Sequence, residues 1–316
     1  MRGWIGRGIV VGAALGIAVG VACEGGPEGV GAGEFDAELA DSLVRRQMEF
    51  GPRVPGTAAH AAALEWMTAY LAERADAVEQ IPFTHVTTVG DTLRLTNVFA
   101  RFRPEVASRV LLLAHWDSRP VSERSADAAD RALPLPGAND GASGVAILLT
   151  IADALAASPP GVGVDILLTD GEDWGHDPVT FATRIEDMLL GARHFADTRG
   201  DTYRPLYGIL LDLVGDQSPR FPREGNSMAY APEVVGRVWD KADELGYGDI
   251  FVDVIGQSIV DDHLPLNEAG IRTINVIDFD YPYWHTREDT ADKVSARTLD
   301  VVGEVVLAVI REQGGP

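Results

Sequence analysis

The sequence predicts a single α/β domain with a mixed, mostly parallel central sheet flanked by helices. Apolar runs of strand length alternate with amphipathic segments of helical length from about residue 35 onward, and no internal repeat interrupts them. Several of the middle runs are nearly continuous in Val, Ile and Leu, as in strands that are covered on both faces. With 316 residues, 46% of them hydrophobic, the chain can bury one large core.

The expected elements follow one another in a regular order. The first helix should span about 58–74, where Leu64, Met67 and Leu71 form one apolar stripe. Strands are expected at 92–102, 109–115, 164–170, 207–215 and 273–279. Further helices are expected at about 143–156, 233–245, 264–269 and 295–311.

The first 22 residues have the pattern of a bacterial export signal. Arg2 and Arg7 precede an apolar, glycine-rich run that is too short for a comfortable membrane span. The ending Gly-Val-Ala-Cys resembles a lipobox, in which Cys23 becomes the lipidated first residue; an ordinary signal peptide with an incidental cysteine is the alternative. Both interpretations predict an exported protein, either periplasmic or anchored as a lipoprotein. Residues 23–34 should form a flexible tether, and residues 35–316 the globular domain.

The composition excludes several classes of partner. Asp and Glu number 48 against 26 Lys and Arg, which gives a net charge of −22, and such a surface repels nucleic acid and anionic lipid. Membrane contact is therefore expected only through a lipid on Cys23. A single cysteine allows no intrachain disulfide, so stability must come from packing or from a bound metal. The oligomeric state is left open.

Acidic and imidazole side chains gather where three of the expected strands end. In open α/β sheets, binding sites form at the carboxyl ends of the strands, so these side chains should converge in one crevice. Any one of the acids alone could instead cap a helix or lie in a loop. The side chains are His115 and Asp117, Glu172 and Asp173, and Asp212.

Two further candidates lie outside these strands. Asp140 is part of the glycine-rich segment GANDGASG, just before the helix expected at 143–156, where it could equally serve as the N-cap. His285 follows Trp284 after the last strand. A group of carboxylates and imidazoles without cysteine suits an open, catalytic zinc site, since a closed cysteine site is excluded.

Seven motifs resemble, in the same order, those of zinc-dependent glutaminyl-peptide cyclotransferases, particularly the bacterial ones. They are GPRVPGT, AHWDSRP, GANDGASG, DGEDWG, LDLVGD, DDHLP and YWHT, and they extend over about 51–285. These enzymes share a fold with the zinc aminopeptidases. The resemblance thus implies a zinc exopeptidase-like three-layer sandwich, a peptide substrate with a free N-terminus, and cyclisation of an N-terminal glutamine to pyroglutamate with release of ammonia.

The resemblance also implies a role for individual residues. One zinc ion is expected, with Glu172 as the proton shuttle beside it. Many relatives have Glu-Glu where this chain has Glu172 and Asp173, so the ligand arm is one methylene shorter here. The implied ligands are Asp140, Asp173 and His285, and the implied catalytic acids are Glu172, Asp212 and Asp262.

Aromatic and outer residues complete the expected site. Trp284 should form the aromatic wall beside the metal, and Trp174 either a second wall or part of the core. Asp117 is expected to orient a neighbouring ligand or strand end. His115 could do the same or could bind a second metal.

A zinc aminopeptidase with one or two metals is the main alternative. Glu172 would then activate a water, and His115 with Asp212 could complete a second site that Asp140 bridges. The available ligands therefore do not separate the two activities. A surface lipoprotein without catalytic activity is a third alternative, although the chain keeps a usable group at every site position. The natural peptides are not predictable from the sequence.

Overall fold

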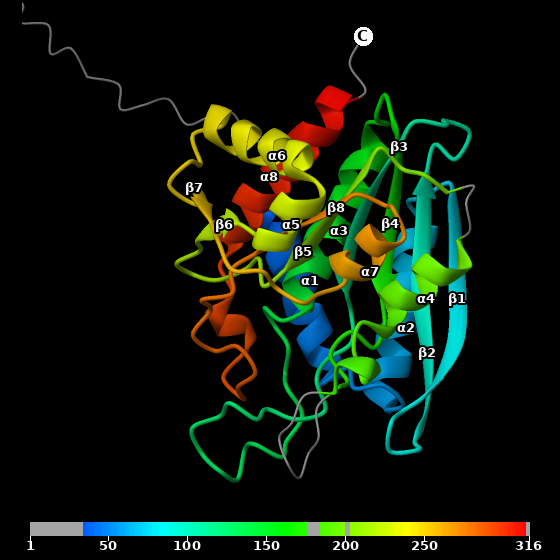
Figure 1. Cartoon of the computed structure of the whole chain (residues 1–316), viewed down its shortest axis with the longest axis vertical. Coiled ribbons are helices and arrows are strands. Elements are labelled where there is room, and N and C mark those ends of the chain that lie inside the picture. Colours follow the sequence, from blue (N-terminus) through cyan, green and yellow to red (C-terminus); the bar gives the residue numbers. More distant parts are fainter. Residues whose placement is uncertain (1–33, 176–183, 200–202, 314–316) are drawn as a thin grey trace, which may run out of the picture. The chain divides into compact units, whose positions relative to one another are not determined.

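The computed structural model describes residues 34–175, 184–199 and 203–313, which form a central sheet between two layers of helices (Figure 1). The prediction of a mixed, mostly parallel α/β fold is confirmed. The strands are β1 (Ala77–Val86), β2 (Thr92–Phe102), β3 (Arg109–His115), β4 (Gly163–Thr169), β5 (Tyr207–Asp212), β6 (Phe221–Arg223), β7 (Phe251–Ile255) and β8 (Thr273–Ile277). The helices are α1 (Ala37–Phe50), α2 (Ala58–Ala72), α3 (Ala142–Ala157), α4 (Leu190–Thr198), α5 (Gly225–Tyr230), α6 (Pro232–Glu244), α7 (His263–Glu268) and α8 (Ala296–Gln313), with 3₁₀ turns at Ile185–Asp187 and Ala291–Lys293.

The main sheet has the strand order β1-β2-β4-β3-β5-β8. Strands β4, β3, β5 and β8 are parallel, whereas β1 and β2 are antiparallel additions at one edge. Every side chain of β3 and β4 is buried, as their uninterrupted apolar sequences predict. The carboxyl ends of the four parallel strands therefore meet at one edge of the sheet.

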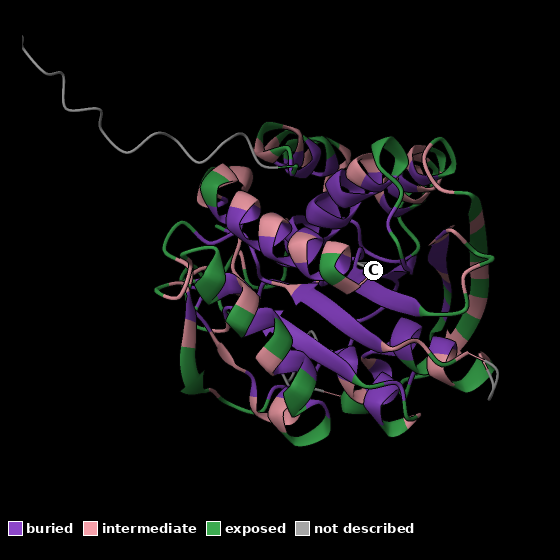
Figure 2. Ribbon diagram, turned by 90° about the horizontal axis from the view of Figure 1, so that it is seen from above, coloured by how far each residue is buried: buried purple, intermediate pink, exposed green. Residues whose placement is uncertain are grey.

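Helices cover both faces of the sheet. The larger core lies under α1, α3 and α8, and a smaller apolar cluster lies on the other face under α4 and α7. Figure 2 shows the central strands and the inward sides of these helices buried, with exposed residues on the outer sides. A rigid sheet that is shielded on both faces fixes the positions of the loops at its edge.

Several elements were not expected from the sequence. Strand β1 lies at the sheet edge and each of its side chains is at least partly exposed, so it has no buried apolar face that would mark it in the sequence. Helix α1 is capped by Asp36 and buries one face against α3 and α8. Strand β5 ends at Asp212 rather than at residue 215, because Leu213 has a positive φ of 50°.

Residues 1–33, which include the expected export signal and Cys23, lie outside the described residues. No helix in the described part of the chain is long and apolar enough to span a bilayer.

Candidate metal centre

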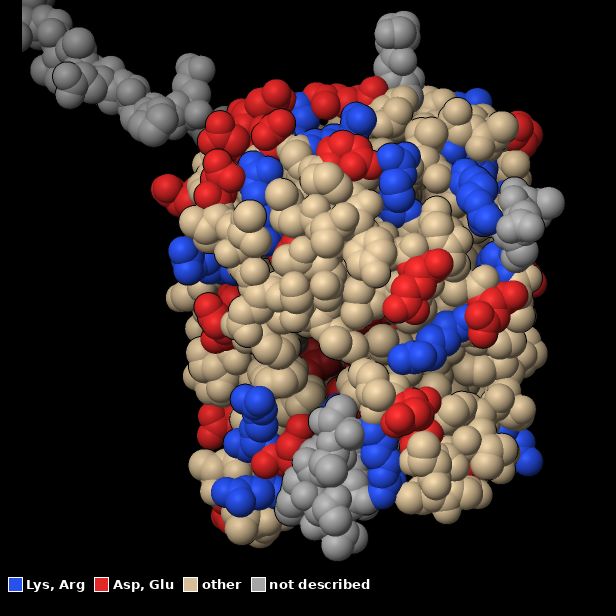
Figure 3. Space-filling model, in the orientation of Figure 1, with Lys and Arg blue, Asp and Glu red and all other residues tan. Residues whose placement is uncertain are grey.

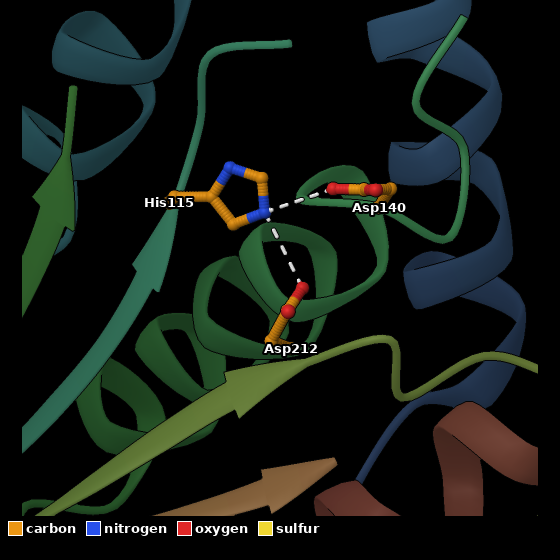
Figure 4. A group of neighbouring side chains, drawn as sticks. All are labelled: His115, Asp140 and Asp212. Atoms are coloured by element: carbon orange, nitrogen blue, oxygen red, sulfur yellow. Dashed lines mark hydrogen bonds and ion pairs between the residues drawn. The ribbon is translucent and has the colours of Figure 1, made fainter. Parts of the chain in front are cut away.

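Two groups of three side chains meet at the carboxyl edge of the sheet and share Asp140. One consists of Asp140, Asp173 and His285, and the other of His115, Asp140 and Asp212 (Figure 4). Within each group the donor atoms lie within 4.8 Å of one another, and all of the residues are buried except Asp212, which is partly exposed. Folding thus brings together five candidate ligands from distant parts of the sequence.

The first group has the shape and the charge of a metal site. His285 Nε2 lies 3.7 Å from Asp140 Oδ2 and 3.7 Å from Asp173 Oδ1. Ligands about 2.0–2.1 Å from a tetrahedral zinc ion are about 3.4 Å apart, so small adjustments would close the site. The other carboxylate oxygen of Asp173 is buried and has no hydrogen-bond partner among the described residues, and burial raises the pKa of Asp173 to about 7. A bound cation would give this second oxygen the partner that it lacks, so the residues fit zinc.

In the second group, a histidine lies between two carboxylates. His115 Nε2 is 3.2 Å from Asp140 Oδ1 and 3.3 Å from Asp212 Oδ1, as Figure 4 shows. Burial opposes a charge on the imidazole, but the surrounding carboxylates still hold the pKa of His115 well above its ordinary value. This group can therefore be satisfied by direct ion pairs, and it also has the donor set of a second metal site.

Asp140 is held in place through its backbone. The carboxylate of Asp289 accepts the N–H groups of Asn139 at 2.8 Å and of Asp140 at 3.1 Å. The next residue, Gly141, has a φ of +84°, and a Cβ atom there would lie 2.8 Å from Cε1 of His115. Gly141 rather than Asp140 is the N-cap of α3, so the alternative role of Asp140 as the cap is wrong. Its side chain is left to face the two histidines.

Asp117 fixes the segment that carries Glu172 and Asp173. Its Oδ1 accepts the N–H of Glu172 at 3.2 Å and its Oδ2 accepts the N–H of Asp173 at 3.3 Å. Glu172 is itself buried, and burial together with the charge of Asp173 raises the pKa of Glu172 well above its ordinary value. A carboxyl group in this state can hold a proton near neutral pH and return it.

His285 has a strained backbone and a charged partner. Its φ of 58° lies in the left-handed region, which costs a non-glycine residue roughly 1 kcal/mol or more and recurs at functional sites. Glu123 Oε1 lies 2.7 Å from His285 Nδ1, which leaves Nε2 directed at the metal group. Burial opposes the charge on Glu123, but His285 and Arg119 lower the pKa of Glu123 to about 2.

Arg119 connects the two halves of the first group. It is buried, its Nε lies 3.0 Å from Glu123 Oε2, and its Nη1 pairs with the carboxylate of Asp173. The fixed positive charge of Arg119 thus lies beside Asp173, a candidate ligand, and beside Glu123, which contacts the candidate ligand His285.

A pair of adjacent acids lies near Glu172. Asp262 is fully buried, accepts a hydrogen bond from the hydroxyl of Thr169, and has a second oxygen with no hydrogen-bond partner in the described chain. Burial and the charge of Asp261 raise the pKa of Asp262 to about 8. Asp261, which the sequence did not single out, accepts the amide of Asn275 at 2.6 Å.

A hollow of about 510 Å³ opens beside His285. Trp284 lies on its wall, with its ring centroid 4.0 Å from that of His285 and 4.5 Å from that of Phe279. Figure 3 shows a hollow in this face of the molecule with acidic side chains at its base. Trp174 packs elsewhere, against a small cluster that contains Leu95 and Leu190.

The geometry agrees with the comparison with known families. The model of peptidase family M28 matches residues 97–310, more than half of the chain. The chain belongs to peptidase family M28. Among solved structures, a glutaminyl cyclase from Porphyromonas gingivalis is 37% identical with a TM-score of 0.85, and the match covers 89% of this chain and 100% of that one.

Other relatives bear the name of aminopeptidases. A leucine aminopeptidase precursor from Bacteroides thetaiotaomicron is 38% identical with a TM-score of 0.85, over 88% of this chain and 97% of that one. Aminopeptidase YwaD from Bacillus subtilis is 28% identical over 218 residues, which is 64% of this chain. The chain spans only 40% of the length of YwaD.

Sequence reasoning missed three supporting residues of this M28 protein. Arg119 lies inside the quoted motif AHWDSRP and Glu123 follows four residues later, but their contacts with Asp173 and His285 form only in the fold. Asp289 follows His285 by four residues and reaches back to the Asp140 loop. The signal that could have found them is an acidic or basic residue a few positions away, in the sequence, from a predicted site residue.

Proposed function

We propose that this M28 protein converts the N-terminal glutamine of peptides to pyroglutamate and releases ammonia, with one zinc ion at Asp140, Asp173 and His285. The observation that carries the proposal is the packing of Trp284 against His285 at the hollow, in a chain that matches the whole length of a glutaminyl cyclase over 89% of its own. An aromatic wall beside a metal ligand suits a pocket that must fold one small side chain over the metal.

The reaction joins two groups of the same residue. The α-amine nitrogen bonds to the side-chain amide carbon, the bond from that carbon to the amide nitrogen breaks, and ammonia leaves. Zinc, when bound, would polarise the amide carbonyl and stabilise the charge that develops on its oxygen. Because nucleophile and electrophile are already linked, the main task of the protein is to hold them in a reactive conformation.

Glu172 is proposed to carry the proton. It would accept a proton from the attacking amine and donate it to the departing nitrogen, so no proton is gained or lost overall. Its raised pKa suits both steps, since general acid–base catalysis works best when the pKa lies near the working pH. Asp117 holds Glu172 in position through the backbone, while the nearby acids Asp173, Asp261 and Asp262 help to raise its pKa.

The aminopeptidase alternative is favoured by one observation, the second group of His115, Asp140 and Asp212. Arg119 weighs against it, because its charge already offsets one carboxylate of the centre and a second dication would add to the positive charge. Metal analysis of the purified full chain should give one zinc per chain for the cyclase and two for a co-catalytic aminopeptidase.

Product analysis tests the activity itself. The zinc-loaded full chain should release ammonia from the amide of Gln-Ala and should leave the peptide bond intact. Leucine anilide should not be hydrolysed. Free glutamine or free aniline would instead support the peptidase. Asp140→Ala, which removes the ligand shared by both groups, is the matched inactive control.

Export is a separate proposal that rests on the sequence of residues 1–23. Cell fractionation of the wild-type chain and of Cys23→Ser tests it. A lipoprotein should leave the membrane fraction when Cys23 is replaced, whereas an ordinary exported protein should be released in both cases.

A further inference from the structure

Arg124 lies at the mouth of the proposed active site and has no acidic partner in the part of the chain that the structure describes. It is exposed, it lines the 510 Å³ hollow, and its Cζ atom lies 4.0 Å from the ring centroid of Trp284. Its backbone N–H donates to the carbonyl oxygen of His285 at 3.1 Å, which ties its position to that of the candidate ligand. Within the described ranges, no carboxylate forms an ion pair with its guanidinium.

Arg119, which also lines this hollow, differs from Arg124 in its burial and its ion pairs. Arg119 is buried, and its charge is taken up by Asp173 and Glu123. Arg124 therefore contributes the positive charge that remains available to a ligand at the mouth. On a chain with a net charge of −22, an unpaired cation beside a group of buried acids is a local exception.

The position of Arg124 matches the path of a bound peptide. The ring of Trp284 lies 4.0 Å from the ring of His285 and 4.0 Å from the guanidinium of Arg124, so two short contacts lead from the metal centre to this cation. An extended peptide advances about 3.3 Å per residue. When an N-terminal glutamine occupies the centre, the residue that follows it passes Trp284 within reach of Arg124.

On the basis of the proposed function, we propose that Arg124 selects peptides whose second residue carries a carboxylate. The carboxylate is either an acidic side chain or, in a dipeptide, the C-terminus. Stacking on the indole restricts the guanidinium, so that less side-chain entropy is lost when its planar N–H groups bind a carboxylate in bidentate fashion. Without this residue, the negative chain would disfavour acidic peptides.

Paired substrates test the inference on the zinc-loaded full chain. Gln-Glu-amide is compared with Gln-Gln-amide for the side chain, and Gln-Ala with its amide for the C-terminus. Ammonia release gives kcat/KM for each. The wild-type chain should favour the charged member of at least one pair by about threefold to tenfold at low salt, and the preference should shrink as salt rises. Arg124→Gln should bring that ratio to one or below.

Arg237→Gln is the matched control, because Arg237 is also exposed and lies over an aromatic ring, that of Tyr207, but does not line the hollow. It should keep the wild-type ratio. Equal rates within both wild-type pairs would overturn the inference. The inference would also be overturned if Arg124→Gln lowered kcat/KM equally for both members of a pair, because Arg124 would then act only by supporting Trp284. Ammonia from none of the four peptides would overturn the proposed function as well.

Discussion

The imidazole Nδ1 of His285 lies 2.7 Å from Oε1 of Glu123, across 162 positions of the sequence. This contact sets the direction of Nε2, the atom that faces Asp140 and Asp173. A histidine ligand whose outer nitrogen bonds a carboxylate is a stronger and better oriented donor. The supporting residues of the centre therefore carry part of its metal affinity.

Replacing Glu123 by Gln should weaken zinc binding by about 10- to 100-fold, because the amide cannot orient and polarise His285 as the carboxylate does. Competition with a fluorescent chelator measures the affinity. Glu49→Gln, which changes an exposed acid on α1, should leave the affinity unchanged. An unchanged affinity for Glu123→Gln would remove this residue from the centre.

Glu172→Gln should lower the rate of ammonia release by about 100- to 10,000-fold while the zinc content stays at the wild-type level. The amide cannot carry the proton, but the backbone contacts to Asp117 do not involve the side chain. Loss of zinc from this variant would show that Glu172 is a ligand and that its role has been misassigned.

Gly141→Ala should destabilise the protein by about 1–3 kcal/mol, because its φ is positive and the new methyl group would contact His115. Gly236→Ala is the control, because Gly236 lies within α6 and its new methyl group would have no described atom within 4 Å other than its chain neighbours and the backbone of its own helix. The change should stabilise the helix by about 0.5–1 kcal/mol. Urea denaturation of metal-free protein gives both values. If both substitutions changed the free energy of unfolding equally, the turn that contains Asp140 would tolerate a side chain at position 141.

The buried carboxylate of Glu224 predicts a loss of stability in acid. Burial opposes its charge, but a nearby His263 at 3.2 Å and hydrogen bonds from Ser227 and Ile259 lower the pKa of Glu224 to about 2. The folded state binds this proton less readily than the unfolded state. The carboxylate therefore contributes its full stability above about pH 4.5, and this contribution declines as the pH falls toward 2.

Wild type and Glu224→Gln should accordingly differ by a few kcal/mol at pH 7, at about 1.4 kcal/mol per pKa unit, and should converge as the pH falls from about 4.5 toward 2. Urea unfolding across this range gives the difference. A gap that stays constant with pH would mean that the lost hydrogen-bond geometry, rather than the charge, accounts for the destabilisation.

The sequence predicted the fold best where a residue pattern is compatible with only one kind of structural element. The apolar runs of β3 and β4 can be stable only as strands covered on both faces, and the polar residues that follow them must then share an edge. Strand β1 was missed because none of its side chains is buried, and β7 because only Phe251 is buried in it. Local pattern carries no signal for such strands, since their partners determine them.

The candidate site was likewise only partly predictable from the sequence. Asp140, Asp173 and His285 could be grouped as ligands from the resemblance to a known family, and Asp173 was also indicated by its place at a strand end. Arg119 and Glu123 could not, because their importance depends on contacts that only the folded chain makes. Trp174 remained undecided between a wall and the core, and it packs against Leu95 and Leu190.

Mass spectrometry of one peptide tests the central claim most directly. The zinc-loaded full chain is incubated with Gln-Ala-Ala-amide, and the mass of the product is measured. The proposed cyclase predicts an intact tripeptide lighter by one ammonia, formed by the wild type and not by Glu172→Gln. A dipeptide amide together with free glutamine would contradict the account and establish the protein as an aminopeptidase.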